Sequence, residues 1–348
     1  MRIAQVAPLY ESVPPKLYGG TERVVSYLTE ELVREGHDVT LFASGDSETA
    51  AELISPCPRA LRLNPESIDH LAYHVLMLDE VVRLARNFDV IHFHTDYLHF
   101  PVSRRSNYTH LTTLHGRLDL RDLVPLYREF AEMPVVSISD AQRAPLPWLN
   151  WVSTVHHGLP EDLYTFHEDG GKYLAFLGRI SPEKGVDQAI KIACQAGIDL
   201  KIAAKVDRVD REYFEAVIKP LLGQPHVEFI GEIAQSEKDD FLGNALGLLS
   251  PINWPEPFGL VFIEALACGT PVVAYQRGSV PEILEDQVTG FIVDSLESAV
   301  DVISQLPNVS RRACRRHFER RFTAPLMSEA YLGVYEQLMR SCFEERVG

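Results

Sequence analysis

The sequence has few cysteines, and none of them form a closely spaced pair. Its 348 residues include five, an odd number that does not suit a framework of disulfides. Scattered cysteines are typical of reduced thiols in a cytoplasmic protein. They are Cys57, Cys194, Cys268, Cys314 and Cys342. We therefore expect a cytoplasmic protein without disulfides.

Long apolar runs are also absent. No segment approaches the roughly 18 apolar residues that a membrane-spanning helix requires. The first residues, Met1 to Pro8, lack the apolar region of a secretory signal peptide. The sequence therefore predicts a protein that is neither membrane-spanning nor secreted.

Basic residues are in deficit, with 33 lysines and arginines against 49 acidic residues and a formal net charge of -16. Such a charge repels nucleic-acid phosphates and anionic lipid headgroups at long range. Short basic clusters such as Arg104-Arg105 are usually solvated surface groups. Nucleic acid is therefore excluded as an expected partner, and membrane association is not favoured.

Three ligand-binding signatures are missing. The chain contains neither the G-x-G-x-x-G dinucleotide fingerprint nor the G-x-x-x-x-G-K-[ST] phosphate loop. Their absence argues against a dehydrogenase and a P-loop ATPase. The chain also has no Asp-x-Asp pair to hold a divalent cation.

The residues that are present suit two globular domains. Apolar residues make up 46% of the chain, and single cores stop growing well below this length. In the first half, short apolar runs alternate with helical patterns, which predicts a parallel α/β sheet. We expect strands at residues 2–7, 38–43, 89–94, 110–115, 134–139 and 151–155, and helices at 21–35, 68–86 and 120–131.

The second half repeats this architecture without repeating the sequence. We expect strands at residues 173–177, 200–204, 227–230, 248–250 and 271–274, helices at 186–196, 212–222, 237–246 and 259–268, and a final helix at 325–343. The polar, turn-rich stretch 157–172 is the predicted linker. We therefore expect domains at 1–160 and 161–324, with the C-terminal helix, 325–348, packing back towards the first domain.

Ligands of open parallel sheets bind beyond the carboxyl ends of the strands, so chemistry is expected in the loops that follow strands. In the first domain, Gly19 and Gly20 lead directly into a helix. Glycines let the backbone approach a ligand, and a helix N-terminus offers amide donors to a phosphate. A purely structural turn explains this pair equally well.

In the second domain, Arg179 ends a predicted strand and Lys184 follows five residues later, before a helix. Two cations at a strand end suit a pyrophosphate. Further along, Glu256 lies in a loop and Glu264 lies within the next apolar helix. Because an unpaired buried carboxylate is costly, we expect Glu264 to have a hydroxyl-rich partner such as a ribose.

In this order and spacing, the motifs resemble the retaining glycosyltransferases of family 4, which have the GT-B architecture. The resemblance covers nearly the whole chain. It rests on Gly19, Gly20 and Glu22; Thr113, Leu114 and His115; Arg179 and Pro182 to Gly185; Glu256, Glu264 and Ala267 to Pro271; and Gly278 to Glu282. It implies two Rossmann-like doubly wound domains that face each other across a cleft.

The resemblance also implies a role for each matched position. Glu264 is expected to bind the donor ribose, and Arg179 and Lys184 the diphosphate. The remaining expected contacts are Glu256 and the amides of Phe258, Gly259 and Leu260 at the sugar, Ile233 at the base, Gly19 and Gly20 at the diphosphate, and His115 near the reacting centre. His92 and His94 are expected to be strand residues that line the cleft, because no third metal ligand accompanies them.

The implied activity is retaining transfer of a hexose from a nucleoside diphosphate sugar, without a cofactor or metal. A UDP-sugar is favoured, with GDP-mannose and ADP-glucose as alternatives. The expected acceptor is a soluble small molecule or saccharide. One alternative is a lipid-linked acceptor reached from the membrane surface, because residues 118–130 are apolar and accompanied by Arg117, Arg121 and Arg128. The others are a sugar-nucleotide epimerase and a non-catalytic binding protein.

Overall fold

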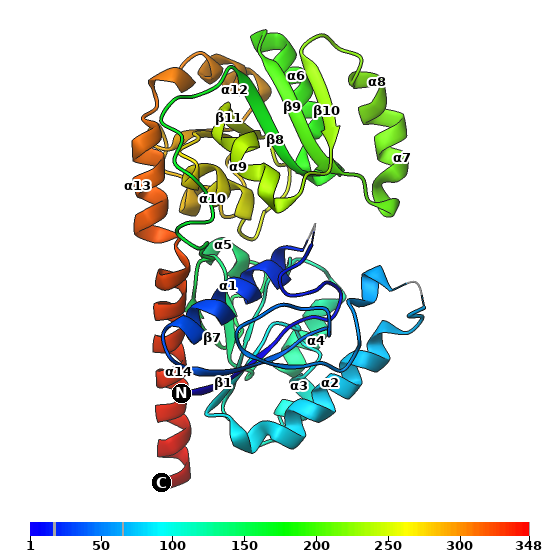
Figure 1. The fold of residues 1–348 in the computed structure, drawn as a ribbon, viewed down its shortest axis with the longest axis vertical. Helices are drawn as coiled ribbons and strands as arrows, with labels where there is room; N and C mark the ends of the chain where they lie inside the picture. Colours follow the sequence, from blue (N-terminus) through cyan, green and yellow to red (C-terminus); the bar gives the residue numbers. More distant parts are fainter. Residues whose placement is uncertain (17–18, 65, 348) are drawn as a thin grey trace. The chain divides into compact units, whose positions relative to one another are not determined.

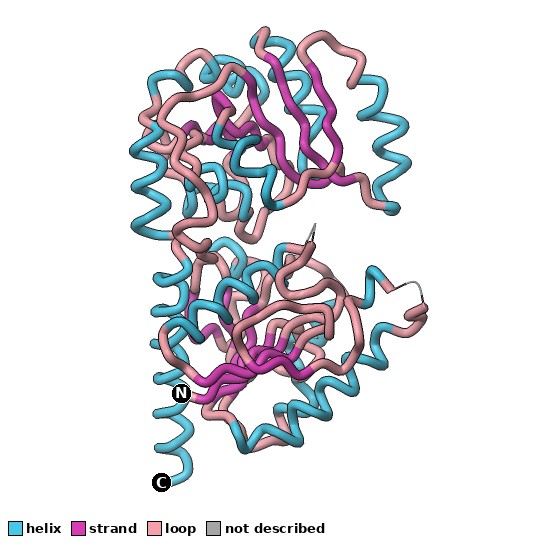
Figure 2. Tube along the Cα trace, viewed as in Figure 1, coloured by secondary structure: helices cyan, strands magenta, loops and turns pink. Residues whose placement is uncertain are grey.

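The computed structural model describes residues 1–16, 19–64 and 66–347, with side chains up to residue 341. Leu17 and Tyr18, next to the predicted glycine pair, lie outside the described residues. The chain divides into two compact units (Figures 1 and 2). Unit 1 comprises Met1–Pro160 and Ala324–Gly348, and unit 2 comprises Glu161–Thr323.

Unit 1 is built on a parallel sheet whose described strands run in the order β3-β2-β1-β4-β5-β6-β7. The strands are β1 (Arg2–Val6), β2 (Asp38–Phe42), β3 (Glu52–Ile54), β4 (Val90–Phe93), β5 (His110–Thr113), β6 (Val135–Ser137) and β7 (Trp151–Thr154). The helices are α1 (Gly20–Arg34), α2 (His70–Leu84), α3 (Phe100–Ser103), α4 (Leu123–Glu129), α5 (Asp140–Arg143) and α14 (Ala324–Val347).

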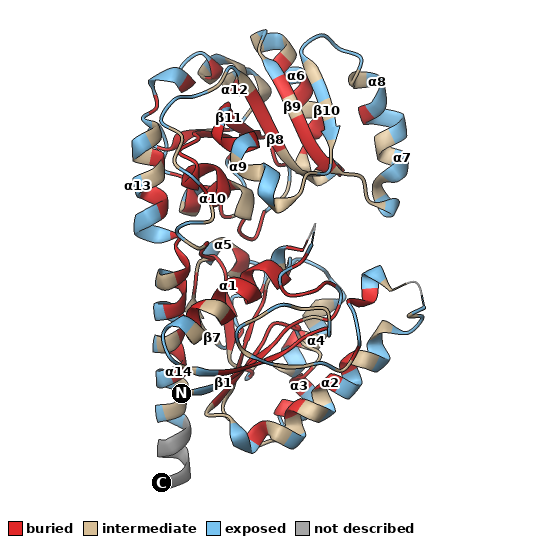
Figure 3. Ribbon diagram, viewed as in Figure 1, coloured by how far each residue is buried: buried red, intermediate tan, exposed pale blue. Residues whose placement is uncertain are grey.

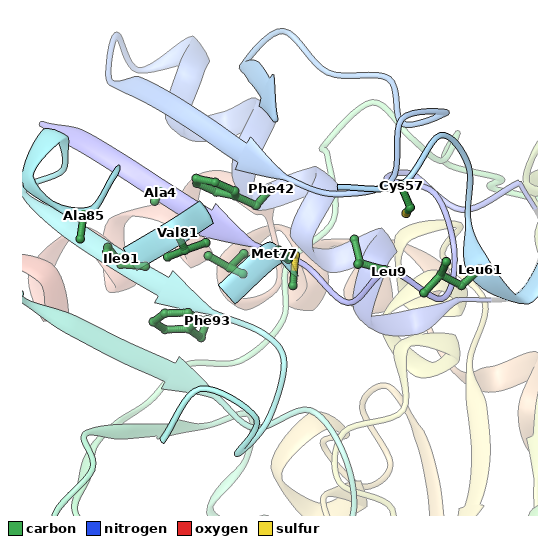
Figure 4. Packing of buried hydrophobic residues seen from close by; sticks show 11 residues of the cluster. Ala4, Leu9, Phe42, Cys57, Leu61, Met77, Val81, Ala85, Ile91 and Phe93 are labelled. Atoms are coloured by element: carbon green, nitrogen blue, oxygen red, sulfur yellow. The ribbon is translucent and has the colours of Figure 1, made fainter. Parts of the chain in front are cut away.

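The two faces of this sheet carry different cores, because successive side chains of a strand point to opposite sides. One face packs against α2 through an apolar cluster drawn in Figure 4. The cluster includes Ala4, Phe42, Met77, Val81 and Phe93. The opposite face lies against α1 and α14 and carries polar side chains, including Gln5 and His92, which are fully buried.

Unit 2 repeats the arrangement, with its described strands in the order β10-β9-β8-β11-β12-β13. The strands are β8 (Tyr173–Arg179), β9 (Asp199–Lys205), β10 (Val227–Gly231), β11 (Ala245–Ser250), β12 (Val272–Tyr275) and β13 (Gly290–Val293). The helices are α6 (Val186–Ala196), α7 (Arg211–Tyr213), α8 (Lys219–Leu221), α9 (Gln235–Gly243), α10 (Leu260–Ala267), α11 (Val280–Ile283), α12 (Leu296–Ile303) and α13 (Arg311–Arg321). Figure 3 shows β8 and β9 largely buried and the edge strand β10 more exposed.

Both sheets share the strand order of doubly wound nucleotide-binding folds. The predicted α/β class, with two doubly wound parallel sheets, is therefore confirmed. The predictions omitted the short edge strands β3 and β13 and the helices α3, α5, α11, α12 and α13. Over the described part of the chain, no helix combines the length and the apolar character that crossing a bilayer requires.

One arginine joins several loops of unit 2. Arg311, at the start of α13, is half-buried, and its hydrogen bonds to the described residues all go to uncharged oxygens. The acceptors are the carbonyl oxygens of His167 at 2.7 Å, Ala245 at 3.0 Å and Gly243 at 2.7 Å, and the hydroxyl of Thr270 at 2.8 Å. The predicted linker is thereby attached to β11 and to the loop after α10.

We expect Arg311→Ala to lower the free energy of unfolding of unit 2 by about 3 kcal/mol, because buried acceptors lose their donors. The adjacent Arg312 supplies a matched control. It pairs with Glu168, both side chains are more than 60% exposed, and Arg312→Ala should cost less than about 0.5 kcal/mol. Urea unfolding measures the free energy of unfolding of both variants. Equal losses for the two variants would contradict this role of Arg311.

Candidate donor-binding site in unit 2

The loops that follow β8 and β11 lie against each other at the carboxyl end of the unit 2 sheet. Between Lys184 and α6, Gly185 adopts a left-handed conformation with φ of 71°, where any side chain would overlap the carbonyl oxygen of Pro251. The amide of Asn253 donates a hydrogen bond of 2.8 Å to the carbonyl oxygen of Glu183. These contacts place Lys184 beside the loop that carries Glu256.

Glu256 lies in a closely packed turn. Its carboxylate accepts hydrogen bonds from Lys184 Nζ and, at 2.9 Å, from Trp254 Nε1. Gly278 packs so closely against the backbone of Glu256 that a side chain there would overlap it. The structure therefore joins two predicted site residues, Lys184 and Glu256, as a half-buried ion pair.

Glu264 faces the interior of unit 2 from α10, and its side chain is only 3% exposed. Its Oε1 accepts a hydrogen bond of 2.7 Å from Lys238 Nζ, on α9. The expectation that a hydroxyl-rich ligand would be the partner of Glu264 was therefore incomplete, because the protein itself supplies a cation. Lys238 was missed because it lies in a polar helix 26 residues away, with no motif around it.

Arg179, the last residue of β8, also faces carboxylates. Its guanidinium lies 3.7 Å from Asp207 and 3.5 Å from Asp210, which belong to the loop after β9. Its Nε makes no hydrogen bond to any described residue. A bound diphosphate would therefore have to compete with these two carboxylates for Arg179.

We expect Asp210→Asn to strengthen binding of a nucleoside diphosphate by about three- to tenfold, because it removes one charge that competes for Arg179. Asp199→Asn is a suitable control, since Asp199 is exposed and pairs with His226. Calorimetric titration with UDP measures both. Weaker binding by Asp210→Asn would mean that Asp210 orients Arg179 instead of competing for it.

The remaining predicted donor contacts of unit 2 lie on two loops. Gly259, with φ of 82°, precedes α10, and Leu260 is the first residue of that helix. The carbonyl oxygen of Phe258 accepts a 2.7 Å hydrogen bond from Ser279. The first amides of a helix have no partner within it and are available to an anion. Ile233 lies half-buried between β10 and α9.

In unit 1, Gly19 is buried and directly precedes α1, of which Gly20 is the exposed first residue. His115 lies half-buried beyond the end of β5. Burial lowers the pKa of His115 to about 3, so its imidazole is neutral. The ring stacks on His157 with centroids 5.3 Å apart.

His92 lies in β4, as expected of a strand residue. His92 and His94 are buried, with exposures of 0% and 2%, so the expectation that they line a cleft was wrong. His94 contacts His115, with 2.8 Å between its Nδ1 and the Nε2 of His115. His92 contacts Thr113 at 2.7 Å and Tyr335, in α14, at 2.8 Å. Within the described residues, no group of three histidine, cysteine or acidic side chains is placed to hold a metal ion.

Asp96 is a site candidate that the sequence did not single out. It follows β4 by three residues, is exposed, and adopts a left-handed conformation with φ of 50°. Such backbone strain in a non-glycine residue often marks a functional loop. The position of Asp96 after a buried strand is the signal that could have identified it.

Two family models match this chain, one in each unit. The Glycosyltransferase Family 4 model matches residues 18–151, and the Glycosyl transferases group 1 model matches residues 165–315. An uncharacterized glycosyltransferase of Methanocaldococcus jannaschii is 26% identical, over 86% of this chain and 88% of that protein. Alpha-maltose-1-phosphate synthase of Mycobacterium tuberculosis is 26% identical, over 96% of this chain and 99% of that protein.

Solved structures agree with this assignment of the fold. AviGT4, a glycosyltransferase involved in avilamycin A biosynthesis, superposes with a TM-score of 0.76 at 24% identity, over 98% of both chains. Anabaena HepE in complex with UDP and glucose superposes with a TM-score of 0.73 at 20% identity, over 97% of this chain and 100% of that chain. The chain therefore belongs to the glycosyl transferases group 1, as a glycosyltransferase of the retaining family 4 that has the GT-B fold and uses a nucleotide sugar.

Proposed function

We propose that this enzyme transfers a hexose from a UDP-sugar, with retention and without a metal ion, to a soluble small molecule or saccharide. The observation that carries the proposal is that Lys184 and Glu256 pair across the loops after β8 and β11, at the sheet edge of unit 2 where Arg179 ends β8. The complexes of HepE with UDP and with UDP-glucose support a uridine donor.

In the proposed mechanism, Glu264 binds the ribose and Lys238 holds its carboxylate in place. Arg179 and Lys184 bind the diphosphate and stabilise the negative charge that develops on it as it leaves. Glu256 and the amides near Phe258, Gly259 and Leu260 hold the sugar, and Ile233 lies at the base. Gly19, Gly20 and His115 are the proposed substrate contacts of unit 1.

Retention is proposed to occur by front-side attack. The acceptor oxygen attacks the anomeric carbon while the bond to the diphosphate breaks, and the leaving phosphate takes the acceptor proton. The motivation is that the sequence motifs of the first domain offer no evident carboxylate nucleophile. Asp96, the candidate that the structure adds after β4, is the carboxylate on which a covalent intermediate would be sought. Trapping of a covalent glycosyl-enzyme intermediate, detected by mass spectrometry, would rule this step out.

We expect EDTA to leave donor turnover unchanged within about twofold, because two cationic side chains supply the charge that a metal ion would otherwise supply. Slow hydrolysis of UDP-glucose by the enzyme serves as the assay, since it requires no acceptor. Proton NMR before mutarotation should show the α anomer of free glucose. Loss of turnover with EDTA that Mg²⁺ restores would refute metal independence, and release of the β anomer would refute retention.

A lipid-linked acceptor is a second candidate, because α2 exposes an apolar row. Leu71, Val75 and Leu76 are each more than 55% exposed. Two arginines within residues 117–128 support the soluble acceptor instead, because they already have partners within the protein. Arg117 pairs with Asp119, and Arg128 lies over the ring of Trp148. Sedimentation with anionic vesicles distinguishes the two acceptor classes, and salt-sensitive pelleting of the enzyme would favour the lipid-linked acceptor.

A further inference from the structure

A chain of buried hydrogen bonds reaches His115 from the opposite end of the sequence. Gln5, in β1, donates from Nε2 to the hydroxyl of Tyr335 at 3.1 Å, and its Oε1 lies 2.8 Å from Nε2 of His94. Nδ1 of His94 lies 2.8 Å from Nε2 of His115. Gln5, His94 and Tyr335 are all almost fully buried, so water does not compete with these bonds.

The direction of each bond follows from its chemistry. Because Oε1 of Gln5 can only accept, the proton of His94 must be on Nε2. Nδ1 of the neutral His94 is then an acceptor, and its donor must be Nε2–H of His115. A neutral imidazole carries one proton, so Nδ1 of His115 has a lone pair. That atom is buried and has no hydrogen-bond partner among the described residues.

We propose that Gln5, through His94, fixes His115 as the Nε2–H tautomer, so that Nδ1 accepts a hydrogen bond from a hydroxyl of the donor sugar. This inference rests on the proposed function, in which His115 contacts the substrate. Gln5 is a positioning residue in it, because it acts through His94. The low pKa of His115 agrees with an imidazole that stays neutral throughout the working pH range.

An unpaired buried acceptor costs free energy until a donor reaches it. A sugar hydroxyl supplies that donor, whereas a ligand group that can only accept does not. The tautomer therefore determines which groups of a substrate His115 favours. If the proton were on Nδ1 instead, the same ring would favour an acceptor such as a phosphate oxygen.

Two tyrosines of α14 provide a matched pair of variants. Tyr335 and Tyr331 are both buried, lie one helical turn apart and stack with centroids 6.2 Å apart. Tyr335 contacts the amide of Gln5 directly, whereas the hydroxyl of Tyr331 contacts Thr113 at 2.8 Å and reaches Tyr335 only through Thr113 and His92. Tyr335→Phe removes the group that orients Gln5, and Tyr331→Phe removes a similar hydroxyl without touching Gln5.

The experiment is a long-range nitrogen–proton NMR spectrum of the full chain labelled at histidine, with His115 assigned from the His115→Gln variant. In the wild type, we expect the proton of His115 on Nε2. Gln5→Leu removes the acceptor that holds the proton of His94 on Nε2, so His115 should lose its preference for the Nε2–H tautomer and carry a substantial share of its proton on Nδ1. Tyr335→Phe should give a mixture of the two tautomers of His115, and Tyr331→Phe should retain the wild-type tautomer of His115.

Donor kinetics provide the second measurement. Gln5→Leu should lower kcat/KM for the donor sugar about tenfold relative to Tyr331→Phe, the loss of roughly one hydrogen bond. A wild-type spectrum with the His115 proton on Nδ1 would overturn the inference, and so would equal kinetics for the two variants. An enzyme that binds no nucleotide sugar would instead refute the proposed function, which the spectrum of the free protein does not test.

Discussion

Glu264→Gln is expected to lower kcat/KM for the nucleotide sugar at least about a hundredfold. The variant keeps the shape of the side chain but removes the charge that we propose binds two ribose hydroxyls, and hydrogen bonds to charged groups contribute about 1.5–3 kcal/mol each. The same change leaves Lys238 without its partner inside unit 2. Steady-state kinetics with the preferred donor measures the effect.

The stability effect of Glu264→Gln must be separated from its effect on binding, because removing one partner of a buried ion pair costs about 3–5 kcal/mol. In the double variant Glu264→Gln with Lys238→Met, no unpaired charge remains, and we expect most of the lost stability to return. Donor binding should stay weak. Recovery of donor kinetics in the double variant would mean that Glu264 serves the fold alone.

Lys184→Ala is expected to lower kcat about a hundred- to a thousandfold with a smaller change in KM. We propose that Lys184 stabilises charge that develops on the diphosphate only as the bond breaks, and removing one such preorganised donor has effects of this size. Arg179→Ala should lower kcat to a similar extent. Single-turnover kinetics separates the chemical step from release of the product.

Lys191→Ala is the matched control for Lys184→Ala. Lys191 lies on α6, pairs with Asp187 and is nearly half exposed, so its loss should leave kcat unchanged. A second variant, Glu256→Gln, tests whether Lys184 acts mainly by holding Glu256. If Lys184→Ala retained the wild-type kcat, the cationic stabilisation of the leaving group would be refuted.

The sequence predicted most of the strands and helices because their apolar periodicity is strong. β3 was missed because it has only three residues, at the edge of its sheet. α13 was missed because most of its surface is charged. Its buried residues, Cys314, His317 and Phe318, form only a narrow stripe at helical spacing. Arg311, which anchors the linker, belongs to this same polar segment.

The sequence singled out candidate site residues at or just after the ends of strands, as with Arg179, Lys184 and Glu256. The partners of these residues could not be predicted, because their pairing depends on how distant segments pack. Lys238 approaches Glu264 from another helix, and Tyr335 lies 330 residues from Gln5 in the chain. Side chains that act through tertiary contacts carry no local pattern in the sequence.

The measurement that tests the central claim most directly is a calorimetric titration of UDP into the wild type and into the double variant Glu264→Gln with Lys238→Met, both in EDTA. We predict saturable binding of one UDP per chain by the wild type and at least about thirtyfold weaker binding by the variant. Equal affinities would contradict the placement of the donor at Glu264, and binding only after Mg²⁺ is added would contradict the metal-free site.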